Sequence, residues 1–93
     1  MIVRIREQCG EFAENKDDAR KLRELFIVPA IAEGQEVVLD FAGVDASTQS
    51  FLHALISQIL QDGGEAALAK LRFMNCNGPI KSLVRTVVNY SLE

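Results

Sequence analysis

The sequence predicts a small α/β domain: a thin sandwich in which a sheet of three or four strands, mostly parallel or mixed, packs with about three helices. Segments with a period of two alternate with segments of helical period, in the order β-α-β-α-β-α. Parallel strands with right-handed crossovers are the usual outcome of such alternation. The 93 residues, 48% hydrophobic and 25% charged, are typical of one globular unit. We therefore expect residues 1–93 to form a single domain.

The first strand is expected in "MIVRIRE", where Val3 and Ile5 alternate with two arginines. In the connection "CGEFAEN", Phe12 is expected either to add a short strand or to anchor the loop. Asn15, at the end of this connection, is a favourable N-cap, so the first helix is expected over residues 16–33. Pro29 has no N–H and clashes with the preceding turn. The helix is therefore expected to kink or break near Phe26.

The segment "EVVLDF" is continuously apolar after its first residue, which predicts a central strand over residues 37–41 that is buried on both faces. A second helix is expected over residues 47–62, because its apolar residues form one wide face. Gly63 and Gly64 are expected to end it, with a short helical turn over residues 65–70.

The next strand is expected in "LRFMNC", residues 71–76. Pro79 follows Gly78 and suits the first position of the last helix. That helix has its expected buried stripe at Ile80, Leu83, Val84, Val87 and Val88.

Composition argues against several functions. The formal net charge is −3, and the basic residues are scattered among acids, which disfavours nucleic acid as a partner. No apolar run is long enough to span a membrane, and no signal peptide is recognisable, so we expect a cytoplasmic protein. Cys9 and Cys76 are far apart and are expected to be free thiols. His53 is the only histidine, and we expect no metal site and no cofactor.

The candidate site lies in "VVLDFAGVDASTQSFLHALI", residues 37–56. Asp40 either makes a polar contact at the end of the strand or accepts hydrogen bonds from loop amides. A helix cap needs only one polar residue, and here four occur in succession, which is consistent with an exposed contact surface. His53 shares a helix face with Gln49 and Ser57. The candidate partner-binding residues are Asp45, Ser47, Thr48, Gln49, Ser50 and His53, with Asp40 in a supporting role.

The motifs "LDFAGV" and "TQSFLHALI", with weaker support from "NKDDARKLR", resemble the STAS-like domain family of unknown function. The resemblance covers residues 15–90. It implies a relationship to the STAS domains of bacterial anti-sigma-factor antagonists, which are small cytoplasmic binding modules. Those modules dock on histidine-kinase-like ATPases that act as serine kinases, and phosphorylation controls the docking.

The antagonists read like "LDLSGVEFIDSSGLGAL" over this stretch, and the first serine after the aspartate accepts phosphate. Aligned without gaps, Leu39, Asp40, Gly43 and Val44 match. Thr48 takes the position of that aspartate, Gln49 that of the phosphoacceptor, Ser50 that of the second serine and Phe51 that of the glycine. Gln49 cannot be phosphorylated, so the remaining phosphorylation candidates are Ser47, Thr48 and Ser50.

These observations favour a non-enzymatic regulatory module, a monomer or homodimer, that docks on a protein partner through the N-terminus of the second helix. The resemblance suggests a histidine-kinase-like ATPase as that partner. One alternative is a small hydrolase or transferase that uses Ser50 and His53, although the chain has no glycine-rich phosphate loop, nucleophile elbow or paired-acid motif. Another is a structural or oligomerising subunit of a larger complex. An enzyme site requires a concave pocket around the polar cluster, whereas a docking face is flat or convex.

Overall fold

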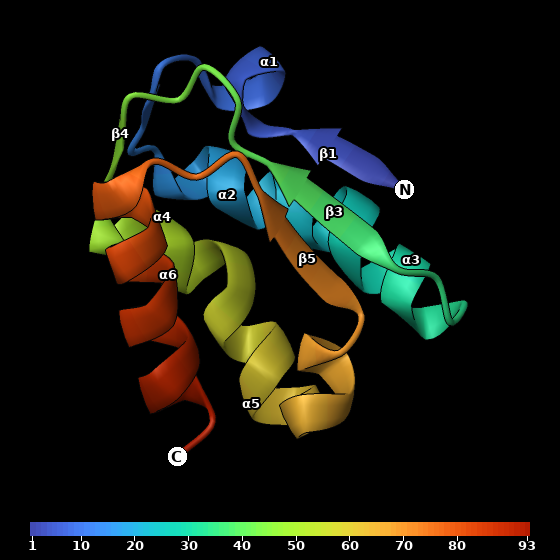
Figure 1. The fold of residues 1–93 in the computed structure, drawn as a ribbon. Coiled ribbons are helices and arrows are strands. Elements are labelled where there is room, and N and C mark those ends of the chain that lie inside the picture. Colours follow the sequence, from blue (N-terminus) through green and yellow to red (C-terminus); the bar gives the residue numbers. More distant parts are fainter.

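The computed structural model describes all residues 1–93 and has a three-stranded parallel sheet at its centre (Figure 1). Its strands are β1 (Ile2–Arg4), β3 (Val37–Asp40) and β5 (Leu71–Met74), with β3 in the middle. In the register, Val38 lies between Ile2 and Arg72. A second, two-stranded parallel sheet joins β2 (Phe12–Ala13) to β4 (Ala46–Ser47). The predicted α/β class, the parallel sheet and the central place of residues 37–41 are confirmed.

Two long helical segments and one further helix pack with the sheet, and a short helix follows β1. The first segment consists of α2 (Lys16–Leu22), η1 (Arg23–Ile27) and α3 (Val28–Ala32), and the second of α4 (Gln49–Leu52), η2 (His53–Ser57) and α5 (Gln58–Leu68). The others are α1 (Ile5–Cys9) and α6 (Gly78–Ser91). No helix is both long and apolar enough to cross a membrane.

The boundaries of several elements differ from the prediction. The strand expected over residues 71–76 ends at Met74. The helix expected to end at Gly63 and Gly64 kinks at Gly64, which has a φ of 60°, and α5 continues to Leu68. The second helical segment begins at Gln49, because Ser47 belongs to β4 and Thr48 is the N-cap. The first strand ends at Arg4, and Ile5 begins α1. The later start of the second helical segment comes from a contact with a distant part of the chain, because β4 pairs with β2 across more than thirty residues.

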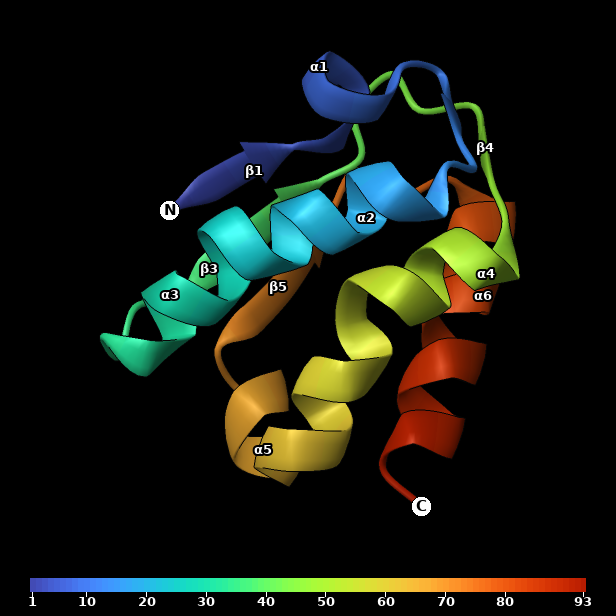
Figure 2. The same cartoon turned by 180° about the vertical axis from the view of Figure 1, so that it is seen from behind.

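The prediction that β3 is buried on both faces was wrong. Val37 and Leu39 are fully buried, whereas Val38 and Asp40 on the other face are half-buried. Figures 1 and 2 show the long helices on one side of the sheet, and the other side carries no helix. Successive crossovers of the same hand, between strands that are added in one direction, place their helices on the same face.

The segments η1 and η2 are π-helical turns inside the two long helical segments. In η1 the N–H of Val28 donates to the carbonyl of Arg23, five residues earlier, immediately before Pro29. Pro29 has no N–H, and the wide turn keeps the chain helical through it. The irregularity expected near Phe26 is therefore a π-helical turn and not a break.

A single hydrophobic core of 22 buried residues joins the sheet to the helices. Phe41 and Phe51 are its largest members and are fully buried. The buried hydroxyls of Ser57 and Ser91 bond to each other at 2.9 Å, so the polar atoms inside this core have partners. The core holds the loop after β3 and the start of α4 in place.

Candidate functional site

Asp40, at the carboxyl end of β3, holds two loops together. Its Oδ1 accepts hydrogen bonds from Nδ2 of Asn75 and from the backbone N–H of Ala42, both at 2.9 Å. The hydrogen bond from Asn75, followed by that from Ala42, lowers the pKa of the Asp40 carboxyl. Of the two roles considered for Asp40, the structure shows the bonding of loop amides.

Two residues, Gly43 and Asn77, shape the loop between β3 and α4. Gly43 has a φ of +77°, and a Cβ there would lie 2.5 Å from Cδ of Arg6, so only glycine fits without strain. Asn77 caps α6 by accepting from the N–H of Ile80 at 3.0 Å, and its Nδ2 donates to the carbonyl of Asp45 at 2.8 Å. The backbone of Asp45 is thus fixed, while its side chain is exposed.

Asn75 and Asn77 were not predicted to shape this region. Both lie in "NCNGP", and an asparagine directly before Gly-Pro is a recognisable N-cap signal. Asn75 has a positive φ of 58°, which asparagine tolerates better than most residues. Their bonds to Asp40 and Asp45 span more than thirty residues and could not be read from local sequence.

Ser47 and Thr48 have structural partners. The Ser47 hydroxyl donates to the carbonyl of Ala13 at 3.0 Å, and the residue is half-buried in β4. The Thr48 hydroxyl accepts from the N–H of Phe51 at 3.0 Å, which caps α4. Both hydroxyls therefore help to form the joint between β4 and α4.

Gln49, Ser50 and His53 lie together on the surface, around a hollow of about 320 Å³ that we call the α4 hollow. Lys16, Ala54 and Tyr90 complete its lining. The side chains of Gln49 and Ser50 are exposed and make no hydrogen bond within the chain. The structure thus brings together three of the six candidate partner-binding residues and leaves Asp45, Ser47 and Thr48 outside the hollow.

His53 is oriented by Tyr90, from the last turn of α6. Nδ1 of His53 lies 2.8 Å from the Tyr90 hydroxyl, and the two ring centroids are 5.7 Å apart. The residues are separated by 37 positions in the sequence, so Tyr90 was not predicted. This contact places an imidazole and a phenol side by side at the hollow.

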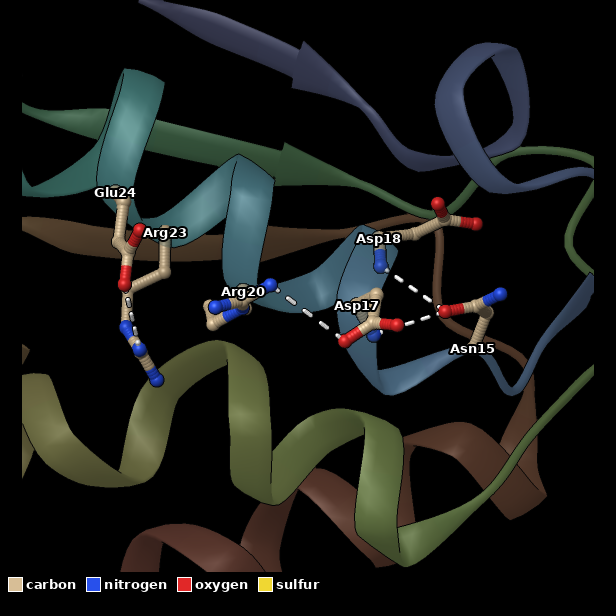
Figure 3. Close-up of polar contacts among 6 residues, drawn as sticks. All are labelled: Asn15, Asp17, Asp18, Arg20, Arg23 and Glu24. Atoms are coloured by element: carbon tan, nitrogen blue, oxygen red, sulfur yellow. Dashed lines mark hydrogen bonds and ion pairs between the residues drawn. The ribbon is translucent and has the colours of Figure 1, made fainter.

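Lys16 comes from the first turn of α2, whose charged face Figure 3 shows. Asn15 caps this helix by accepting from the N–H groups of Asp17 and Asp18, at 2.8 and 3.2 Å. Arg20 pairs with Asp17 at 3.6 Å, and both side chains are mostly solvated. Arg23 instead points toward the second helical segment, where its Nη1 donates to the carbonyl of Ala54 at 2.8 Å.

The chemistry available in the α4 hollow is limited to an amine, an amide, a hydroxyl, an imidazole and a phenol. No carboxylate lines it, and His53 bonds to Tyr90 and not to Ser50. A base–orienter chain of the kind that activates a serine nucleophile is therefore not assembled here. No three His, Cys, Asp or Glu side chains lie close enough together to hold a metal ion.

The two cysteines lie outside the hollow as half-buried free thiols. Burial, with a smaller contribution from Asp18, raises the pKa of Cys9 to about 11. Burial also raises the pKa of Cys76. Both groups are therefore neutral thiols near pH 7, the less reactive form.

The arrangement is that of a small STAS-like α/β domain with a polar surface at the first turn of α4. The sequence matches the family described as a STAS-like domain of unknown function (DUF4325) over residues 18–81, which is more than half of the chain. The protein belongs to this family, as the motifs in its sequence indicated. No curated protein and no solved structure matches the chain.

Proposed function

We propose that the protein is a non-enzymatic regulatory module of the bacterial cytoplasm that docks on a protein partner through the α4 hollow. Membership of the STAS-like family supports a regulatory module in general terms. The observation that carries the docking surface is that Gln49 and Ser50 are exposed, adjacent and unbonded, beside the exposed His53. Polar side chains that do not hold the fold together are available to bind another molecule.

The relatives of this family suggest a histidine-kinase-like ATPase as the partner and a hydroxyl as the regulated group. Ser50 is the hydroxyl of the three candidates that is free of structural bonds, because those of Ser47 and Thr48 are engaged. A phosphate on Ser50 would add a charge of about −1.5 to −2 in the first turn of α4, where the helix dipole favours it. Lys16 lines the same hollow and supplies a cation.

The hydrolase alternative has one observation in its favour, which is that Ser50 and His53 share a concave surface. However, no carboxylate lines the hollow beside His53, and Nδ1 of its imidazole is bonded to the Tyr90 hydroxyl. The reading as a structural subunit has no comparable support from a particular residue. Docking is thus the function that the arrangement of side chains supports best.

The test is capture of partners from host extract by the tagged protein and by the variants Gln49→Glu and Ser50→Ala. We expect both variants to lose the same captured protein. Exposed residues elsewhere supply matched controls, Gln8→Glu and Ser82→Ala, which should retain it. Thermal melts should show that Ser50→Ala keeps the wild-type stability, whereas Thr48→Ala loses about 1 kcal/mol with its cap.

If site and control variants capture the same proteins, the α4 hollow is not a docking surface. A screen against generic ester and phosphoester substrates addresses the enzyme alternative. Turnover that disappears when Ser50 and His53 are both changed to alanine would replace the docking proposal with a hydrolase.

A further inference from the structure

The helical segment through η1 and α3 has an apolar surface that nothing covers. Residues 25–32, "LFIVPAIA", contain no polar side chain. Ile27 and Ala30 are buried in the core, but Leu25 is 65% exposed and Val28 is 45% exposed. A helix that is apolar on all sides is normally buried on all sides. We therefore expect the exposed side of this segment to be covered by another molecule.

Residues of α3 and α5 together line a hollow beside this surface. Figure 2 shows α3 at the far end of the first helical segment from α2. The α3–α5 groove measures about 260 Å³. Its apolar lining comes from Val28, Ile31 and Ala32 on one side and from Ile59 and Ala67 on the other. A groove between two helices with a mostly apolar floor is the geometry that accepts the apolar face of a third helix.

The charges around the groove are mostly negative, and the exception is Lys70, whose Nζ donates to the carbonyl of Gly34 at 3.3 Å. Asp62 is the only charged residue in the lining. Glu33 follows Ala32 directly, and Glu65 lies two residues after Gly63. These three acidic residues are exposed, and none of them takes part in an ion pair. The groove thus combines an apolar floor with a surplus of negative charge, three carboxylates against one ammonium.

We propose that the α3–α5 groove is a second docking surface, which binds an amphipathic helical segment of a partner protein whose apolar face is flanked by lysine or arginine. A second copy of this chain is a poor occupant, because it would bring the same carboxylates against Asp62 and its neighbours. The proposal goes beyond the function of the α4 hollow, because no residue lines both surfaces.

The test uses two designed helical peptides of leucine, alanine and lysine, identical except that glutamate replaces every lysine in the second. Fluorescence anisotropy should show binding of the basic peptide and not of the acidic one. Asp62→Lys should lower the affinity for the basic peptide by about five- to tenfold, because the substitution replaces an electrostatic attraction by a repulsion. Val28→Ser should also lower this affinity, because the substitution removes apolar contact area from the groove.

Two kinds of control separate this result from other effects. Glu14→Lys makes the same charge change at an exposed site outside the groove and should leave the affinity within about twofold of the wild type, since distant surface charges are screened. Gln49→Glu and Ser50→Ala alter only the α4 hollow, so they should leave peptide binding unchanged even if the proposed function fails.

The proposal is overturned if the basic peptide does not bind, if both peptides bind equally, or if Asp62→Lys has no effect. Sedimentation provides the remaining check. A wild-type dimer that Val28→Ser dissociates would assign the groove to a second copy of the chain.

Discussion

Neighbouring polar residues in "DASTQS" have different roles because the chain changes direction between Ser47 and Gln49. Ser47 still faces β2, Thr48 turns its hydroxyl toward the start of α4, and Ser50 lies on the outer side of the first helical turn. Small polar residues before an apolar run indicate a helix N-terminus. The local pattern therefore predicted a helix N-terminus here, but it did not show which hydroxyl remains free.

The residues that complete the α4 hollow come from elsewhere in the chain. Lys16 lies in the first helical segment, and Tyr90 lies at the end of α6. Local periodicity carries no information about which distant side chains meet. Part of the candidate site was thus predictable from residues 49–53, while its partners required the fold.

Asp40 gives a prediction about pH dependence. Its pKa is lowered in the folded state, so its contribution to stability is complete above the ordinary pKa of about 3.9 and is lost as the pH falls through the lower, folded value. Asp40→Ala should therefore reduce the free energy of unfolding by up to about 1 kcal/mol at pH 7. The difference from wild type should stay constant down to about pH 5 and shrink below about pH 4.

Urea unfolding at a series of pH values measures this difference. Asp45→Ala is the matched control, because the exposed Asp45 carboxylate has no hydrogen-bond partner. A difference between Asp40→Ala and wild type that does not change between pH 7 and about pH 3 would contradict the assigned role of the carboxylate.

At the scale of elements, periodicity predicted the three main strands, the two long helical segments and α6. For β2 it left two possibilities, that Phe12 adds a short strand or that it anchors the loop. It could not predict β4 or the pairing of β2 with β4, because each of these strands has two residues and exists only through that pairing. It also missed α1, where the alternation of "MIVRIRE" matches a strand as far as Arg4. Short elements depend on tertiary contacts more than on their own sequence.

The two π-helical turns are connected by Arg23. Its guanidinium lies in η1 and donates to the carbonyl of Ala54 in η2, and its side chain is only 20% exposed. π-helical turns disturb the regular α-helical bonding of carbonyls, so a side-chain donor is useful there. The pattern of apolar residues did not indicate this contact, because arginine on a helix is usually solvated.

Arg23→Ala should therefore destabilise the protein by about 1–3 kcal/mol, because the carbonyl of Ala54 loses a charged donor in a partly buried position. Urea unfolding measures the loss. Arg20→Ala is the control and should cost less than about 0.5 kcal/mol, since Arg20 forms only a solvated ion pair with Asp17. Equal costs for the two variants would show that the contact between η1 and η2 contributes little.

At the scale of the molecule, the main difference from the prediction is the open face of the sheet, because β3 was expected to be buried on both faces. An unbroken apolar strand usually has helices on both sides. Here Val38 lies between Ile2 and Arg72 in the register, and Ile2 is 54% exposed. The apolar run of β3 thus reflects full burial at Val37 and Leu39 and partial burial at Val38.

This asymmetry predicts different costs for neighbouring substitutions. Leu39 is fully buried against the helices, so Leu39→Ala should lower the free energy of unfolding by about 2–5 kcal/mol. Val38→Ala should cost less than about 1.5 kcal/mol, because the side chain is only partly buried. Total stability for a domain of this kind is about 5–10 kcal/mol, so Leu39→Ala should unfold at clearly lower urea concentration.

Because one core joins all layers, unfolding followed by far-ultraviolet circular dichroism and by tyrosine fluorescence should give coincident single transitions in both variants. Separate transitions would mean that the chain does not behave as a single domain. If Val38→Ala instead costs as much as Leu39→Ala, and its cost falls on dilution of the protein, the open face is covered by a second copy in solution. An equal cost at every protein concentration would show that the face is less open than its exposure indicates.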